Sequence, residues 1–126
     1  MSILKSAVIA ASLCFAGSVL AAGEHEHKPK YGGVVEEVKE VQYEFVAMAD
    51  SIAIFVEDHG KKVDTKGASA KVTLLSGKDK SDSTLTPAGD NKLEAKGSFK
   101  VGPGTKVVAV VTLAGKPATS VRFTLK

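Results

Sequence analysis

Cysteine is almost absent from this chain of 126 residues, and tryptophan is missing altogether. The one cysteine, Cys14, lies in an apolar N-terminal stretch that we expect to be removed from the mature protein. The mature chain would then have no disulfide, no thiol nucleophile and no thiolate metal ligand. It also lacks the buried tryptophan and the paired cysteines of antibody domains, so a likeness to those domains is one of architecture alone.

Sequence motifs of common enzymes are absent as well. The chain has no Gly-Xaa-Ser-Xaa-Gly elbow, no Walker loop and no His-Glu-Xaa-Xaa-His pair. Gly102-Pro103-Gly104 lacks the lysine and the helix start of a phosphate-binding loop, so it is predicted to be a turn. Lysine and acidic residues are interspersed rather than gathered into the basic stripe of a nucleic-acid-binding surface. We therefore expect neither an enzyme nor a nucleic-acid-binding protein.

Residues 1–22 have the three parts of a signal peptide. Lys5 supplies a positive charge, residues 6–20 are uncharged and mostly apolar, and the small residues Ala21 and Ala22 follow. The apolar run is shorter than the ~20 residues of a membrane-spanning helix, and no second run follows it. We expect an exported protein that is cleaved near Ala21 or Ala22 and has no membrane span in its mature form.

Residues 31–126 form the predicted domain, and their apolar residues alternate with a period of two, which is typical of half-buried strands. The expected inward faces are Val41, Tyr43, Phe45 and Ala47; Ile52, Ile54 and Val56; Ala70, Val72 and Leu74; Leu93 and Ala95; Val107, Ala109, Val111 and Leu113; and Val121, Phe123 and Leu125. Residues 107–111 are apolar on both faces, which predicts a central position in the sheet. Because turn residues separate these runs, the sequence predicts an all-β fold, an immunoglobulin-like antiparallel β-sandwich of about seven or eight strands.

Residues 23–30 precede this domain and are predicted to be a flexible tail, because they are polar and have nothing to bury. Glu24, His25 and His27 lie in it, and imidazole and carboxylate groups suit copper, nickel and zinc. If cleavage follows Ala22, the new N-terminal amine, two backbone amides and His25 can form a square-planar site that favours Cu(II) or Ni(II). Cleavage after Ala21 removes this chelate. The alternative is that the tail merely keeps the N-terminus soluble.

His59 is the third histidine and lies in the turn Asp58-His59-Gly60. Turn positions accept these residue types because they tolerate unusual φ angles, so His59 is either a turn residue or a metal contact at one end of the sandwich. Met48 is predicted to pack on its strand rather than to offer its thioether to Cu(I). The candidate metal ligands are therefore Glu24, His25, His27 and His59, and the candidate cofactor is Cu(II) or another divalent transition metal.

Several segments of the domain resemble a known group of proteins. They are Tyr31-Gly32-Gly33-Val34-Val35, Val41-Gln42-Tyr43-Glu44-Phe45-Val46, Val56-Glu57-Asp58-His59-Gly60-Lys61, residues 85–93 from Leu85-Thr86-Pro87 to Leu93, and Val121-Arg122-Phe123. The domain resembles small periplasmic proteins that accompany heavy-metal efflux systems in Gram-negative bacteria, and is similar to β-sandwich segments of the periplasmic adaptor subunits of those pumps. A histidine often precedes the Gly-Gly pair in that group, whereas this chain has Tyr31.

This resemblance implies a periplasmic, non-catalytic binding protein that takes part in copper or other transition-metal handling. It also implies partners among the components of an envelope efflux system. The alternative is a structural or protein-interaction module of the cell envelope with no metal role, which would dock through an exposed sheet edge.

Overall fold

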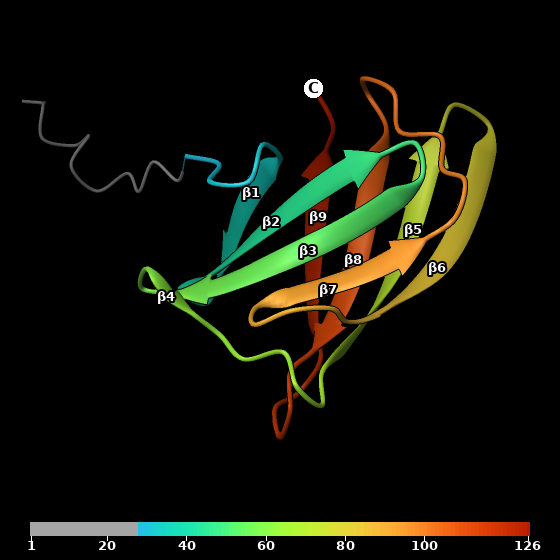
Figure 1. Ribbon diagram of the computed structural model, residues 1–126. Helices are drawn as coiled ribbons and strands as arrows, with labels where there is room; N and C mark the ends of the chain where they lie inside the picture. The colour runs from blue at the N-terminus through green and yellow to red at the C-terminus, as the bar shows by residue number, and fades with distance from the viewer. Residues whose placement is uncertain (1–27) are drawn as a thin grey trace, which may run out of the picture.

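A computed structural model describes residues 28–126, which form nine β-strands and no helix (Figure 1). The strands are β1 (Val34–Val38), β2 (Val41–Met48), β3 (Ser51–Asp58), β4 (Lys61–Lys62), β5 (Ser69–Ser76), β6 (Asp79–Pro87), β7 (Lys92–Lys96), β8 (Lys106–Thr112) and β9 (Thr119–Thr124). Every pairing between them is antiparallel, so the predicted all-β antiparallel fold is confirmed. The count exceeds the expected seven or eight because β4 consists of only two exposed lysines, which leave no alternating pattern in the sequence.

The strands form one sheet in the order β1-β2-β3-β7-β6-β5-β8-β9, with β4 paired to β3. The sheet folds over so that β1, β2, β3 and β7 lie in front of β9, β8, β5 and β6 (Figure 1). β6 joins the two layers, since it pairs with β5 along residues 79–85 and with β7 only through Thr86 and Pro87. At the other side β1 packs against β9, which makes the sheet nearly closed and barrel-like.

The core lies between the two layers and consists of the inward residues of each strand. Its largest fully buried apolar side chains are Phe45, Ile52, Ile54, Leu85, Leu93, Val56, Val72, Val107, Val111 and Val121. Phe45 of β2 packs on Phe123 of β9 with ring centroids 5.5 Å apart, which ties the front layer to the back one. Burying an aliphatic or aromatic side chain of this size contributes about 1.5–3 kcal/mol, so packing stabilises the fold without disulfides.

β8 occupies the central position that its sequence predicts, between β5 and β9. Val107, Ala109 and Val111 face the core and are buried. The opposite face of β8 is not covered to the same extent, because Val110 keeps 38% of its surface exposed. Apolar residues on both faces of β8 therefore predicted that it has a neighbouring strand on each side. They did not predict complete burial of both faces.

Two tight hairpin turns lie at one end of the front layer, and both carry residues in a strained backbone conformation. The turn between β1 and β2 consists of Lys39 and Glu40, with φ angles of +53° and +70°. The turn between β3 and β4 consists of His59 and Gly60, with φ angles of +52° and +82°. Positive φ at both positions is the pattern of type I′ turns, for which Asn-Gly is the usual sequence. A left-handed conformation costs a residue with a Cβ atom about 1–2 kcal/mol, so three residues here are strained.

Candidate functional site

Residues 28–33, which we call the N-terminal strap, fold back over the outer face of β2 and β3. Glu44 of β2 accepts hydrogen bonds from the backbone N–H groups of Lys30, Tyr31 and Gly33, each at 2.8 Å. Glu44 is buried, with 5% of its surface exposed. Three charge-assisted bonds to one carboxylate fix the course of the strap, because each such bond is stronger than a bond between neutral groups.

Gly33 is required where the strap meets β2. A Cβ atom at this position would lie 2.1 Å from the carbonyl oxygen of Phe45, a distance that no side chain can occupy. The absence of a Cβ atom therefore lets the strap backbone approach the strand.

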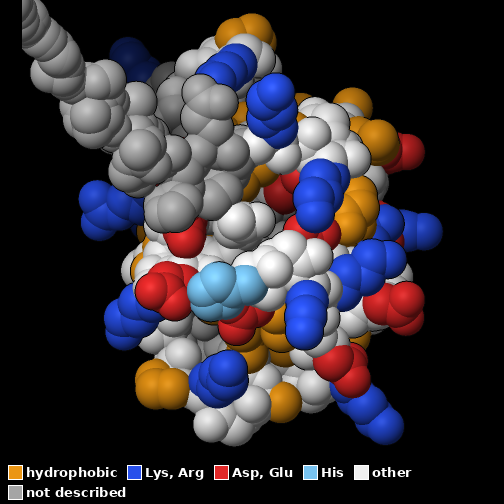
Figure 2. Space-filling view, turned by 90° about the vertical axis from the view of Figure 1, so that its left-hand side faces the viewer, with side chains coloured by type: hydrophobic (Ala, Val, Ile, Leu, Met, Phe, Trp, Pro, Cys, Tyr) orange, Lys and Arg blue, Asp and Glu red, His pale blue; other side chains and the backbone are white. Residues whose placement is uncertain are grey.

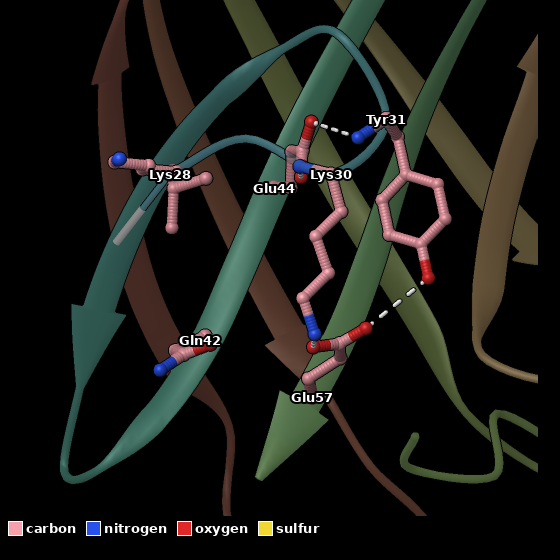
Figure 3. A pocket seen from close by; sticks show the side chains of 7 residues that line it. Lys28, Lys30, Tyr31, Gln42, Glu44 and Glu57 are labelled. Atoms are coloured by element: carbon pink, nitrogen blue, oxygen red, sulfur yellow. Dashed lines mark hydrogen bonds and ion pairs between the residues drawn. The ribbon is translucent and has the colours of Figure 1, made fainter. Parts of the chain in front are cut away.

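A second buried carboxylate, that of Glu57 on β3, receives the side chains of the strap. Lys30 Nζ lies 2.7 Å from Glu57 Oε1, and the hydroxyl of Tyr31 donates to Glu57 Oε2 at 3.1 Å (Figure 3). Glu57 is only 6% exposed. The hydrogen bond and the charge of Glu57 raise the pKa of Lys30 above its ordinary value. The strap thus covers this carboxylate and also supplies the positive charge that pairs with it.

The ring of Tyr31 stacks flat on that of Phe55, with centroids 3.8 Å apart and planes 6° from parallel. The ammonium group of Lys92 lies 5.6 Å from the centroid of the same Phe55 ring. Asn91 donates to the carbonyl oxygen of Val56 at 3.1 Å and holds the start of β7 against β3. Tyr31 therefore has a packing and hydrogen-bonding role in this chain.

The strap leaves almost no space beneath it. The cavity that it covers measures about 20 Å³ and is lined by Lys28, Lys30, Tyr31, Val35, Gln42, Glu44 and Glu57 (Figure 3). A single water molecule needs about 10–15 Å³ by the same measure, so this space has room for about one water. The strap fills its own site, and the two carboxylates anchor the chain rather than bind a ligand.

His59 lies exposed at the strained β3–β4 turn, between two carboxylates. Its Nδ1 is 2.5 Å from Asp58 Oδ1, and its Nε2 is 3.3 Å from Glu40 Oε1. The His59 side chain is 69% exposed, and Figure 2 shows it at the surface among acidic side chains. His59 is thus a turn residue, as one of the two hypotheses states. Its imidazole is also accessible, as the alternative hypothesis of a metal contact requires.

Of the four predicted metal ligands, His59 lies within the described residues. Glu24, His25 and His27 lie outside the described residues, as does the predicted signal peptide of residues 1–22. Within residues 28–126, no group of three or more His, Cys, Asp or Glu side chains is arranged to hold a metal ion. Met48, which the sequence predicts to pack on its strand, is 56% exposed instead, because it is the last residue of β2 and lies beside the turn to β3.

Sequence reasoning missed the strap and its two anchors. Glu44 and Glu57 were not among the predicted site residues, and Lys30 was assigned to the tail of residues 23–30. One signal was available: Ala53 and Phe55 make the outer face of β3 apolar as well, which indicates that something covers it. The segment before β1 contains the aromatic residue and the glycines that such a cover needs.

Among residues 28–126 no helix is long and apolar enough to cross a membrane. Comparison of the chain with protein-family models, with curated proteins and with solved structures finds no match.

Proposed function

We propose that this chain is an exported, non-catalytic periplasmic protein that binds Cu(II) or a related divalent transition metal and serves an envelope efflux system. His25 and His27 are the main ligands in this proposal, and Glu24 and His59 are further candidates. The observation that supports it best is the anchoring of the strap, because Glu44 and Glu57 hold Lys30 three positions after His27. The barrel then acts as a scaffold that carries a short metal-binding segment.

Anchoring favours metal binding because it limits the entropy that the ligands lose. A segment attached to a fixed point samples fewer conformations before it binds, so less free energy is spent on ordering it. Lys28 also lines the same small cavity as Glu57, and Asp58 and His59 directly follow Glu57 in β3 and its turn. Lys28, the residue that follows the proposed ligand segment in the chain, is thus part of the anchored strap.

Imidazole and carboxylate ligands define the metal class. Neutral imidazole nitrogen suits Cu(II), Ni(II) and Zn(II), and affinity for such sites generally peaks at Cu(II) among first-row divalent ions. The expected absence of cysteine from the mature protein leaves no thiolate to favour Cu(I). Met48, although exposed, is a single thioether and adds little to Cu(I) affinity.

The test combines two measurements on untagged protein purified from periplasm. Intact mass spectrometry fixes the N-terminus, and a Cu(II) titration followed by visible absorption reports the ligand field. We expect one tight equivalent in the native protein, its loss when His25 and His27 are both replaced by alanine, and a smaller change in His59→Ala. Met48→Leu is the matched control and should bind Cu(II) like the native protein. Binding no tighter than that of a generic histidine-containing peptide would overturn the proposal.

A protein-interaction module without a metal role is the second candidate, and the open sheet edges favour it. β1 and β9 face each other without hydrogen-bonded pairing, and no strand of residues 28–126 pairs with the second edge of β6 along residues 79–85. Charged residues such as Asp79, Lys80 and Asp82 protect the β6 edge from pairing. The β1–β9 opening is therefore the better docking edge. This candidate predicts that the protein does not respond to metals. It also predicts a specific envelope partner, whose binding is lost when Val35 is replaced by proline.

A further inference from the structure

A second cavity, separate from the strap, opens at the end of the barrel that carries the strained turns. It measures about 210 Å³ and lies between the β1–β2 turn and the connection from β8 to β9. Figure 1 shows the connection from β8 to β9 at the lower end of the barrel. Val41, Val111 and Leu113 supply apolar walls. Mouths of β-barrels are common sites for small molecules, and apolar walls with a few polar groups are typical of such sites.

The polar groups of this cavity are well defined. Tyr43, only 2% exposed, lines the cavity together with Thr119. The two side chains are hydrogen-bonded to each other, and burial nevertheless raises the pKa of Tyr43 above its ordinary value. The phenol is neutral in the physiological range, as a tyrosine ordinarily is.

Two lysines stand at the mouth of the cavity, and no acidic side chain is among the residues that line it. Lys39 and Lys116 line the cavity from its two connections, and both are exposed. The carboxylates of Asp58 and Glu40 contact the imidazole nitrogens of His59. The charge of Asp58 also contributes to the raised pKa of Tyr43, so the two lysines must outweigh it at the cavity. The mouth thus presents two ammonium groups above an apolar floor.

The backbone at Lys39 gives an independent indication. Lys39 lies in the left-handed region at φ +53°, where asparagine would be less strained. Strain of this kind persists where the surrounding structure holds it, and it gathers at binding sites. Lys39 shares this strain with Glu40, and of the two only Lys39 lines the cavity.

We infer that this cavity binds a small organic anion with an apolar body, such as a single-ring carboxylate. The apolar part lies against Val41, Val111 and Leu113, and the carboxylate meets Lys39 and Lys116 at the mouth. The size fits, since a cavity of ~150 Å³ holds a benzene ring. This cavity, at about 210 Å³, leaves room for a short substituent on the ring. This site is independent of metal binding and uses none of the proposed metal ligands.

The test is an NMR titration of the exported protein, free of metal, with 3-phenylpropanoate as the probe. We expect saturable shifts at the amides of Tyr43, Val111 and Thr119, with a Kd of ~1 mM or tighter, as suits a ligand of this size. The uncharged 3-phenylpropanol and the cationic 3-phenylpropylamine are the matched probes. Both should bind at least about fivefold more weakly, because they lack the charge that the lysines attract.

Variants distinguish the site from general attraction to a basic protein. Lys39→Asn combined with Lys116→Gln should weaken 3-phenylpropanoate binding at least about tenfold, because both ammonium groups are lost. Lys78→Asn combined with Lys80→Gln removes the same charge at the opposite end of the barrel, on the β5–β6 hairpin, and should leave the affinity unchanged. All four lysines are exposed, so both variants should fold.

Several results would overturn the inference. Equal affinity for the alcohol and the carboxylate would contradict an anion site, and the absence of saturable shifts would remove the site altogether. Nuclear Overhauser contacts between the cavity and residues before Lys28 in ligand-free protein would show that the chain fills the cavity itself. Shifts of the same amides on raising protein concentration alone would show that a second copy of this chain is the occupant.

Discussion

Tyr31 and Phe55 lie face to face with ring centroids 3.8 Å apart, although 24 positions separate them in the chain. Phe55 belongs to the outer face of β3, which points away from the core formed by Ile54 and Val56. The pair therefore forms a small apolar contact outside the barrel. The polar bonds of Glu44 and Glu57 surround it, and together they make the strap part of the folded domain.

This pairing predicts graded effects of replacing Tyr31. Tyr31→Phe keeps the stacked ring and loses the hydrogen bond to Glu57, so the free energy of unfolding should fall by about 0.5–1.5 kcal/mol. Tyr31→Ala also loses the ring contact and should cost about 2 kcal/mol or more. Urea unfolding measures both. Combined with Phe55→Leu in a double-mutant cycle, Tyr31→Ala should show a coupling energy of about 1 kcal/mol, and additive effects would contradict the stacking contribution.

Glu44 should be the residue on which the strap depends most. Glu44→Ala removes the only acceptor that three strap N–H groups share, so residues 30–33 should detach while the barrel remains folded. Hydrogen exchange of the Tyr31 and Gly33 amides should become fast, whereas the amides of β8 keep their protection. Glu36→Ala is the control, because Glu36 is an exposed residue of the neighbouring strand. Continued protection of the Gly33 amide in Glu44→Ala would show that another contact holds the strap.

Periodicity alone was enough to predict the inward faces of the strands. Residues such as Ile54, Val72 and Phe123 alternate with polar neighbours, and one buried face is all that such a pattern requires. The strap could not be predicted in this way, because its bonds join residues 11 to 27 positions apart and have no period. Glu44 and Glu57 look like solvated residues until the chain before β1 is known to cover them.

The cavity at the end of the barrel, which Lys39 and Lys116 line, could not be predicted from the sequence either. Lys39 and Lys116 belong to turns far apart in the chain, and only the packing of β1 near β9 brings them to one opening. The left-handed conformation of Lys39 was not expected either, since lysine and glutamate do not mark a type I′ turn. Asp58-His59-Gly60 did indicate a turn, and the structure confirms one there.

Relaxing the strained β1–β2 turn should stabilise the protein. Lys39→Asn combined with Glu40→Gly supplies the residues that a type I′ turn prefers, so the free energy of unfolding should rise by about 1 kcal/mol or more. For a domain of this size that corresponds to a melting temperature about 4–8 °C higher. Glu40→Gly also removes the contact with His59, but this exposed ion pair contributes little. A lower melting temperature would show that Lys39 and Glu40 are held by contacts that outweigh the strain.

Alkaline pH should weaken the fold through Tyr43 and Lys30. Burial raises the pKa of Tyr43 above 10.0, and Glu57 raises the pKa of Lys30 above 10.5. Above those ordinary values the unfolded chain releases protons that the folded chain keeps, so the unfolded state binds fewer protons and stability falls as pH rises. The stabilisation from both groups is therefore complete below about pH 10 and is lost as pH passes through the folded pKa values.

Removing either titrating group should flatten this dependence. Urea midpoints of the native protein, Tyr43→Phe and Lys30→Met, measured at about pH 8 and about pH 11, give the change in stability for each. Tyr43→Phe should start lower at the neutral end, since it loses the hydrogen bond with Thr119, and then fall less than the native protein. Lys30→Met should behave in the same way, since its contact with Glu57 is already absent at the lower pH. An equal loss of stability in all three proteins would contradict this prediction. It would assign the alkaline transition to deprotonation of the other lysines, which both substitutions leave in place.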